Sequence, residues 1–310
     1  MENTRAKTTR NSLILLLTAT IWGMAFVSQS KGMDYMHPFT FNGVRSLIGA
    51  AGILVYILIS RKIAGDKAAK LDWKLNVRAG LLCGIFLTIA STLQQFGIKY
   101  TSVGKAGFIT TLYIIFVPMF GIFLKKKVAP VVGAAAGMAA VGMYLLCMTE
   151  SLRLGAGDIM VFLCAIAFAI QIMTVDHYAA RIDGAVVSCI QFTVCGVVCC
   201  IGALIWGQPT FGQLQEGLGA LLYAGVLSCG VGYTLQIVGQ KGLNPTVAAL
   251  IMSLESVIAT ISGWIAYKIG FLTTDQTLTA RQIAGCVIVF AAVILVQLPP
   301  EWFRFGKKNA

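Results

Sequence analysis

Charged residues are scarce in this 310-residue sequence, at 12% of the total, whereas 57% of the residues are hydrophobic. Because a water-soluble domain ordinarily carries about 25% charged residues, this composition excludes an ordinary soluble chain and indicates a membrane protein. Histidine is rarer still, with His37 and His177 as its only copies, and no HExxH, GxSxG or P-loop motif occurs. These absences argue against a zinc hydrolase, a serine hydrolase and ATP-driven chemistry.

Acidic residues are also few, since 12 Asp and Glu stand against 24 Lys and Arg. In a soluble domain such a surplus would suggest nucleic acid, but here the cations lie between apolar runs and act as topology signals, so we expect no nucleic-acid partner. The nine cysteines all lie within apolar runs. We therefore expect packing thiols, with no disulfide, metal site or cofactor. Cys195 and Cys199 share a helical face, but no third ligand stands near them in sequence.

Long apolar runs fill most of the chain. A spanning helix needs about 20 apolar residues, and the breakers between the runs predict an all-α integral membrane protein with ten transmembrane helices. The predicted spans are 12–30, 39–60, 77–98, 104–124, 128–148, 158–178, 185–206, 217–239, 246–267 and 281–298. None of the connectors is long enough to form a soluble catalytic domain.

The distribution of Lys and Arg predicts the orientation of these spans. With the N-terminus inside, the cytoplasmic segments hold 17 cations, the opposite side holds six, and Arg45 lies within a span. Positive residues accumulate on the cytoplasmic side, so we expect both termini there, in the inner (cytoplasmic) membrane of a prokaryote. The segment 299–305 has the aromatic and basic composition of an interfacial anchor.

An internal repeat is visible at an offset of 142 residues. Positions 92–126 and 234–268 share ten identities in 35, among them Gln94/Gln236, Gly97/Gly239 and Lys99/Lys241. The offset moves each span by five helices, and an odd displacement turns the second copy upside down in the membrane. We therefore predict two inverted five-helix repeats, residues 1–150 and 151–310. Such repeats can exchange conformations around a shared cavity, which is the architecture of an alternating-access carrier.

Several short motifs resemble the EamA-type family of the drug/metabolite transporter superfamily. They are Ile21–Val27, Pro38-Phe39, Val44–Ala50, Ala106–Ile109 with Tyr113 and Pro118, and Ser253-Leu254-Glu255. The resemblance covers both halves of the chain and implies secondary export of small metabolites, amino acids or drugs. One position departs from the family pattern: Ser256 follows the glutamate, where similar proteins usually have proline.

Two charged residues, Arg45 and Glu255, stand within predicted spans and away from their first and last turns. Glu255 is near the middle of span nine, where an acidic residue costs ~2.5–3.5 kcal/mol, and it is a candidate for proton coupling or gating. A carboxyl group that is kept neutral or hydrogen-bonded for structural reasons explains it equally well. Arg45 is either a cation for a substrate carboxylate or a bridge between helices, and its position near the end of span two favours the structural role.

Polar residues at helical spacing predict a cavity lining. Thr88, Ser91 and Gln95 form a stripe on span three, and Trp22 and Gln29 share a face of span one. The full set of predicted cavity residues is Trp22, Gln29, Thr88, Ser91, Gln94, Gln95, Tyr113, Gln171 and Gln236. For each residue alone, a helix-to-helix hydrogen bond is the competing explanation.

The leading hypothesis is therefore a secondary transporter that exports a small molecule by alternating access. A passive facilitator or channel of the same fold is the alternative, and an intramembrane lipid-modifying enzyme is a third. The sequence does not identify the substrate, the coupling ion or the direction, and it leaves the oligomeric state open, although a monomer suffices.

Overall fold

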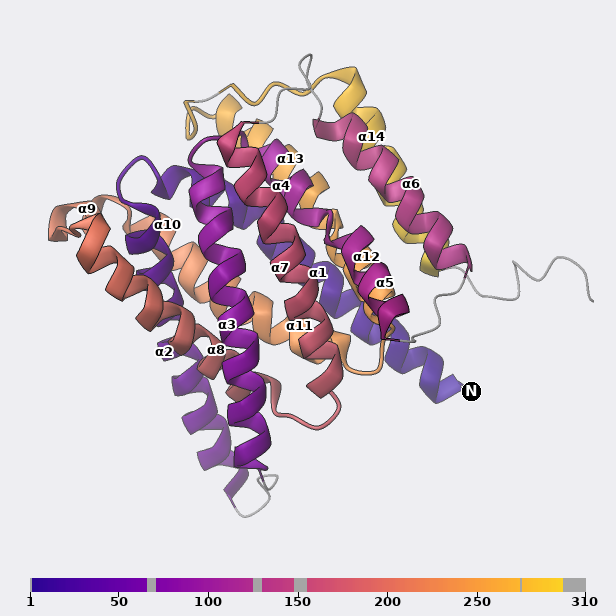
Figure 1. The fold of residues 1–310 in the computed structure, drawn as a ribbon, viewed down its shortest axis with the longest axis horizontal. Helices are drawn as coiled ribbons and strands as arrows, with labels where there is room; N and C mark the ends of the chain where they lie inside the picture. Colours follow the sequence, from indigo (N-terminus) through magenta and orange to yellow (C-terminus); the bar gives the residue numbers. More distant parts are fainter. Residues whose placement is uncertain (1, 66–70, 125–129, 148–154, 274, 298–310) are drawn as a thin grey trace, which may run out of the picture.

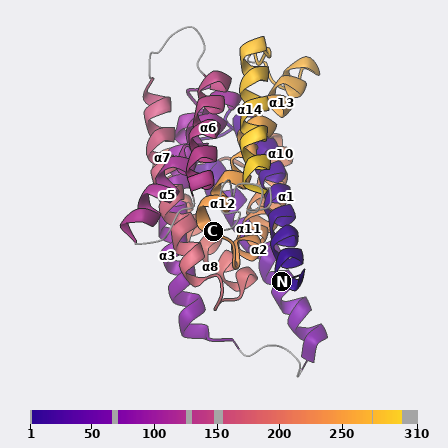
Figure 2. The ribbon, with the colours of Figure 1, turned by 90° about the vertical axis from the view of Figure 1, so that its right-hand side faces the viewer.

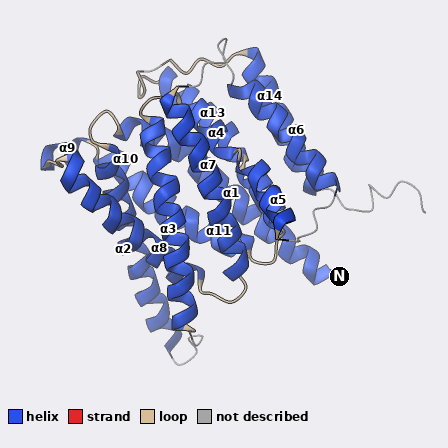
Figure 3. Cartoon of the chain, viewed as in Figure 1, coloured by secondary structure: helices blue, strands red, loops and turns tan. Residues whose placement is uncertain are grey.

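The computed structural model describes residues 2–65, 71–124, 130–147, 155–273 and 275–297. Within these ranges the regular structure consists of helices alone (Figure 3). The predicted all-helical class is confirmed for this part of the chain. Residues 299–305, the predicted interfacial anchor, lie outside it.

The chain folds into helices in the order that follows. The N-terminal part contains α1 (Glu2–Gly32), α2 (Pro38–Ala64), α3 (Trp73–Ile98), α4 (Val103–Thr111), α5 (Tyr113–Phe123) and α6 (Pro130–Cys147). The C-terminal part contains α7 (Ala156–Tyr178), α8 (Gly184–Gly202), η2 (Ala203–Gly207), α9 (Phe211–Glu216), α10 (Leu218–Leu222), η3 (Tyr223–Gly232), α11 (Tyr233–Gln240), α12 (Pro245–Met252), α13 (Leu254–Lys268) and α14 (Ala280–Gln297). The elements η2 and η3 are π-helical.

Several helices begin where the sequence supplies a cap. α2 starts with Pro38 at its first position, which suits proline because the missing N–H needs no partner there. The preceding His37 accepts a hydrogen bond from the Phe39 amide at Nδ1 (3.4 Å). Burial and the neighbouring Lys99 lower the pKa of His37, which favours the neutral imidazole that this bond requires. Asn244 caps α12 in the same way through the Thr246 amide.

Eight segments of the described chain are long and apolar enough to cross a membrane. They coincide with predicted spans one to four and six to nine. The two remaining predicted spans, 128–148 and 281–298, coincide with α6 and α14, whose apolar stretches Pro130–Gly142 and Ala280–Leu295 are shorter. Membrane crossing by these two helices stays a prediction.

Two predicted spans are interrupted near their middle, which the sequence did not indicate. The break between α4 and α5 falls at Leu112, and the break between α12 and α13 falls at Ser253. At each break an i→i−3 hydrogen bond forms, from Leu112 to Ile109 and from Ser256 to Ser253. No proline or glycine occupies either break, so hydropathy alone could not reveal them. The second break places Glu255 in the first turn of α13.

The helices pack as pairs that join distant parts of the sequence. α2 lies against α8, α3 against α7, and α1 against α13. α6 and α14 lie side by side at one edge of the molecule (Figures 1 and 2). A continuous cluster of buried apolar side chains joins helices from both ends of the chain, α6 and α14 included. The polar residues described below are set into this cluster.

Glycine permits two of the closest helix contacts. A Cβ atom at Gly97 of α3 would meet the Val161 side chain and lie 2.8 Å from the Gly157 carbonyl oxygen of α7. A Cβ atom at Gly239 of α11 would lie 2.7 Å from Leu15 of α1. Small residues let membrane helices approach to this distance. The two glycines are a matched pair of the 142-residue repeat, so the same contact occurs twice.

We expect Gly97→Ala to lower the thermal unfolding midpoint of the purified protein, because overpacking a close contact costs about 1–3 kcal/mol. Gly52→Ala is the matched control, since no atom lies within 4 Å of a Cβ built at Gly52 of α2. The control should unfold at the wild-type temperature or slightly above it, because alanine is the better helix former. Equal midpoints for the two variants would contradict the close packing of α3 on α7.

Candidate functional site

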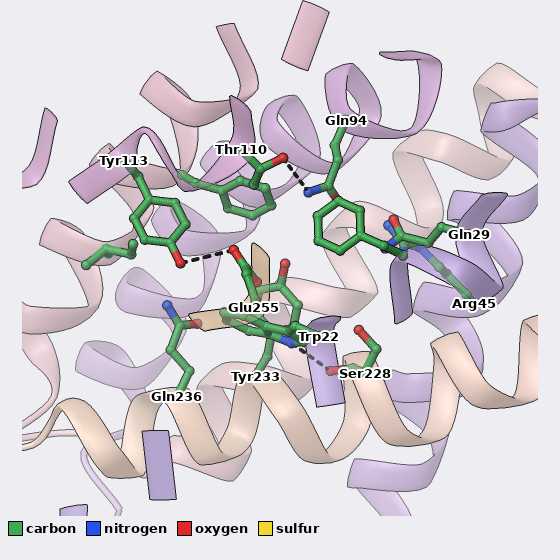
Figure 4. A pocket seen from close by; sticks show the side chains of 13 residues that line it. Trp22, Gln29, Arg45, Gln94, Thr110, Tyr113, Ser228, Tyr233, Gln236 and Glu255 are labelled. Atoms are coloured by element: carbon green, nitrogen blue, oxygen red, sulfur yellow. Dashed lines mark hydrogen bonds between the residues drawn. The ribbon is translucent and has the colours of Figure 1, made fainter. Parts of the chain in front are cut away.

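A cavity lies at the centre of the helical assembly (Figure 4). Its lining comes from α1, α2, α3, α4, α5, α7, η3, α11 and α13. The lining residues are Trp22, Phe26, Gln29, Arg45, Gln94, Thr110, Tyr113, Phe168, Ile172, Ser228, Tyr233, Gln236 and Glu255. The cavity volume is about 30 Å³, which holds about two water molecules.

Glu255 is the acidic group of the cavity and is 3% exposed. Its Oε1 accepts a hydrogen bond from the Tyr113 hydroxyl at 3.0 Å. Both residues stand at helix starts created by the two interruptions, and the partial positive charge of a helix N-terminus favours a carboxylate there. Among the described residues, no cation pairs with Glu255. A molecule that enters the cavity therefore reaches Glu255 without displacing an ion pair.

Arg45 is the cation of the cavity and is 5% exposed. Its Nε donates to Asn42 Oδ1 at 2.9 Å, and its guanidinium carbon lies 5.5 Å from the Phe41 ring centroid. These contacts fix the side chain but use only one of its five N–H donors. In the described part of the chain, no carboxylate pairs with Arg45. It therefore keeps free donors for an anionic group.

Aromatic rings form part of the cavity wall. The Trp22 and Tyr233 ring centroids are 4.5 Å apart. Trp22 Nε1 donates to the Ser228 carbonyl oxygen at 3.4 Å, which orients the indole. Phe26 and Phe168 add further apolar surface. Figure 4 shows Trp22 and Tyr233 between the Arg45 side of the cavity and the Tyr113 side.

Three glutamine side chains supply amide groups at the cavity. Gln94 Nε2 donates to the Thr110 hydroxyl at 3.2 Å, and Gln236 Nε2 donates to Gln171 Oε1 at 3.1 Å. Gln29 differs, because its buried Oε1 has no hydrogen-bond partner. An unsatisfied buried acceptor is costly. Gln29 is therefore suited to accept a donor from a bound molecule.

The structure brings seven of the eleven predicted site residues to this one cavity: Trp22, Gln29, Arg45, Gln94, Tyr113, Gln236 and Glu255. The other four lie behind the lining. Thr88 donates to the Gly84 carbonyl, Gln95 to the Gln29 carbonyl, and Ser91 contacts Asn42. Gln171 reaches the cavity only through Gln236. Substrate contact by any of the eleven stays a prediction.

Sequence reasoning missed six residues of the lining: Phe26, Thr110, Phe168, Ile172, Ser228 and Tyr233. Apolar residues in an apolar helix give no periodic signal of a cavity. A shared spacing in the sequence could have identified two of these six residues. Phe168 and Ile172 have the same spacing on α7 as Trp22 and Phe26 have on α1.

Cys195 and Cys199 share a face of α8, as their spacing predicts. Asn42 Nδ2 contacts both sulfurs, at 3.9 and 3.3 Å, and Ser46 and Ser91 also reach Cys195. Nowhere in the described ranges do three or more His, Cys, Asp or Glu side chains gather as metal ligands would. The thiols take part in packing between α2, α3 and α8.

An ion pair joins α4 to α7 at one end of the helical assembly. Lys105 Nζ lies 2.6 Å from Asp158 Oδ2, and Thr101 donates to Asp158 Oδ1 at 2.9 Å. The Asp158 side chain is 4% exposed and the Lys105 side chain 22%, so the pair is partly buried. Asp158 also lies in the first turn of α7, where a helix N-terminus favours an acidic residue. Its partners are visible only once α4 is placed against α7.

Comparison with known proteins identifies the family of this chain. The model of the EamA-like transporter family matches residues 10–148 and again residues 155–298. The chain belongs to the EamA-like transporter family. It is therefore a multi-pass membrane transporter, and the family membership predicted from its motifs is confirmed.

Similar proteins extend over almost the whole of this EamA-family transporter. An uncharacterized transporter of Archaeoglobus fulgidus is 27% identical over 290 residues, which cover 92% of this chain and 84% of that protein. An uncharacterized transporter of Clostridium kluyveri is 22% identical over 91% of each chain. The uncharacterized transporter YoaV of Bacillus subtilis is 20% identical over 95% of this chain and 97% of its own.

A solved crystal structure has the same fold. It superposes with a TM-score of 0.73 at 16% sequence identity, over 96% of this chain and 99% of the other. At this identity the likeness concerns the arrangement of helices alone.

We expect Tyr113→Phe to destabilise this EamA-family transporter by about 1–3 kcal/mol, because it removes the hydroxyl that donates to a buried carboxyl oxygen of Glu255. The measurement is the thermal unfolding midpoint in detergent. Tyr56→Phe is the matched control, since Tyr56 is 60% exposed on α2. A Tyr113→Phe variant as stable as the control would mean that the bond contributes nothing to the fold.

Proposed function

We propose that this transporter is a secondary carrier that exports small zwitterionic metabolites, with apolar amino acids as the first class, by alternating access. One observation carries the proposal: the buried cation of Arg45 and the buried acid of Glu255 face one cavity without pairing with each other. Burying a charge costs free energy unless it is paired. A ligand that brings both complementary charges satisfies both residues at once.

The positions of the two groups favour an amino acid over a simple ion. A carboxylate suits the guanidinium of Arg45, whose planar donors match its geometry. An ammonium group suits Glu255, with the unpartnered Oε1 of Gln29 as a further acceptor in the cavity. The rings of Trp22 and Tyr233 suit an apolar side chain. A drug-like amine with an aromatic body would use the same wall and Glu255.

The proposal includes two inverted five-helix repeats, residues 1–150 and 151–310. The two separate matches to the family model support it. So does the hydrogen bond between Tyr113 and Glu255, which are exactly repeat-related at a separation of 142 residues. Residues that are equivalent by a two-fold operation meet only at its axis. The same offset relates Gln94 to Gln236, and both line the cavity.

A second offset supports the same symmetry. Gly97 contacts Gly157 and Val161 of α7, and its counterpart Gly239 contacts Asn11 and Leu15 of α1. These contacts relate α1 to α7 by 146 residues. The same spacing pairs Trp22 with Phe168 and Phe26 with Ile172, and all four line the cavity. The cavity is therefore built largely from equivalent positions of the two halves.

Alternating access follows from this arrangement, because inverted halves can exchange conformations around a fixed central site. Ten spans divide into two halves of five, and this odd number of crossings in each half inverts the second copy while both termini stay in the cytoplasm. A passive channel of the same fold is the competing function. The cavity volume of about 30 Å³ favours the carrier, since a closed site must expand to admit a metabolite.

Glu255 gives the carrier a route to proton exchange. Its carboxylate is neutralised either by the ammonium group of a substrate or by a proton, because no side-chain cation is in place to do so. A carrier that returns empty would then carry a proton inward for each substrate that leaves. This would supply the energy for export without ATP.

We expect Glu255→Gln to abolish accumulation that is driven by a pH gradient, because an amide neither takes up nor releases a proton. In wild-type proteoliposomes with an acidic lumen, labelled amino acid should accumulate up to about tenfold per pH unit for one-to-one exchange. Counterflow of unlabelled against labelled substrate should persist in the variant at a reduced rate.

The matched control is Glu216→Gln, because Glu216 lies exposed on α9 and outside the cavity. It should accumulate substrate as the wild type does. Accumulation by Glu255→Gln that still follows the pH gradient would refute proton coupling through this residue. Flux that neither saturates nor shows counterflow in the wild type would favour a channel.

We expect Arg45→Gln to weaken binding of a zwitterion by about 10- to 100-fold, because a charge-assisted hydrogen bond contributes about 1.5–3 kcal/mol. Ligand-induced thermal shifts with three probes measure this: leucine, its decarboxylated amine and its deaminated acid. The wild type should prefer leucine to both analogues. The variant should lose the difference between leucine and the amine.

Arg78→Gln serves as the control, because Arg78 is exposed on α3. Its preference among the three probes should equal that of the wild type. If Arg45→Gln binds leucine as tightly as the wild type does, Arg45 has only a structural role.

A further inference from the structure

A second cavity, distinct from the central one, lies between α1, the connection from α7 to α8, and α11. Its volume is about 230 Å³. Its lining residues are Lys7, Arg10, Asn11, Ala179, Ile182, Gly184, Ile237, Val238 and Lys241. Three of these are cations, and no Asp or Glu is among them. Nothing in the carrier mechanism uses this site.

The fold assembles the three cations from both ends of the sequence. Lys7 and Arg10 lie one turn apart on α1, and Lys241 follows the last residue of α11. Asn11 holds the two elements together, because its buried Nδ2 donates to the Lys241 carbonyl oxygen at 2.8 Å. The bond uses the backbone of Lys241, so its ammonium group stays available.

The neighbouring acid does not neutralise this cluster. Asp183 precedes the lining residue Gly184, but its Oδ1 accepts hydrogen bonds from the Ala185 and Val186 amides at 2.9 and 3.2 Å. Its carboxylate is thus committed to the N-terminus of α8. Within the described ranges, the ion pairs of the protein do not involve Lys7, Arg10 or Lys241.

We infer that this cavity binds the phosphate headgroup of an anionic phospholipid, with the three cations around the phosphate. The rest of the lining decides between a lipid and a soluble phosphate. Ala179, Ile182 and Ile237 form a buried apolar wall, and Val238 is 39% exposed beside them. A soluble phosphate compound gains nothing from contact with an apolar wall, whereas an acyl chain packs against it. Basic pockets between membrane helices commonly bind lipid headgroups in this way.

The test is lipid binding by the purified full-length protein in neutral detergent, followed by native mass spectrometry during titration. The probes are phosphatidylglycerol, phosphatidylcholine and glycerol 3-phosphate. We expect phosphatidylglycerol to bind at least about tenfold more tightly than either of the others. The triple variant Lys7→Gln, Arg10→Gln, Lys241→Gln should weaken it about 100-fold, since each surface cation contributes about fivefold to anionic-lipid binding.

Two further variants separate the site from general charge effects. Lys62→Gln, Lys74→Gln, Arg78→Gln removes the same charge from exposed positions of α2 and α3 and should leave binding unchanged. Val238→Trp adds bulk at the apolar wall without changing charge, and should weaken phosphatidylglycerol binding while the cations remain. Both results support the lipid site.

Three results would overturn it. An equal loss in the two triple variants would mean that net charge alone attracts the lipid. Glycerol 3-phosphate binding as tightly as phosphatidylglycerol would assign the site to a soluble phosphate. Equal affinity for phosphatidylcholine, which has no net charge, would mean that the three cations do not determine lipid binding.

Discussion

The cost of holding charge away from water is the constraint on which the rest of this transporter depends. Arg45 and Glu255 are almost fully buried, and neither has an ionic partner among the described residues. The fold compensates each only in part, through Asn42 and Phe41 for the guanidinium and through Tyr113 and a helix start for the carboxylate. The unsatisfied remainder is what a substrate can supply. In the proposed carrier, the residues that select the substrate are therefore the same residues whose burial costs stability in the empty protein.

The interruptions at Leu112 and Ser253 decide where the buried carboxyl group of Glu255 lies along its helix. An unbroken helix would carry Glu255 in its middle, with every neighbouring amide committed to an i→i−4 bond. The break at Ser253 instead makes Glu255 a first-turn residue. Since Tyr113 occupies the equivalent place after the other break, the two half-helices meet at their starting turns. In the proposed repeat, these matched positions carry different chemistry, a phenol in one half and an acid in the other.

Hydropathy was sufficient to predict the positions of most helices. Apolar runs must lie in lipid and the breakers between them in water, so their alternation marks the spans directly. Hydropathy could not reveal the interruptions, which depend on contacts between halves. Cavity-lining residues were predictable where a polar side chain in an apolar span had few other possible partners, as for Glu255 and Gln236. The prediction was less reliable for Thr88 and Gln95. Their helical face was predicted, but a face does not specify whether a hydroxyl or amide ends at a cavity or at a backbone carbonyl. Phe168 and Ile172 carried no polar signal, and only their equivalence to Trp22 and Phe26 distinguishes them.

The contacts at the two ends of the assembly are not equivalent, and this bears on direction. Lys105 and Asp158 hold α4 against α7 by an ion pair. The repeat offsets place Val247 and Ser12 at the corresponding positions of the other end, and the buried Ser12 hydroxyl has no partner there. That end is held instead by the neutral bond from Asn11 to the Lys241 carbonyl. In the proposed inverted arrangement, the two ends are therefore held by different chemistry, a partly buried ion pair at one end and a neutral hydrogen bond at the other. Two halves of equal shape and equal contacts would open equally to either side. In the proposed carrier, this difference in contacts makes the two ends unequal in the free energy needed to open them.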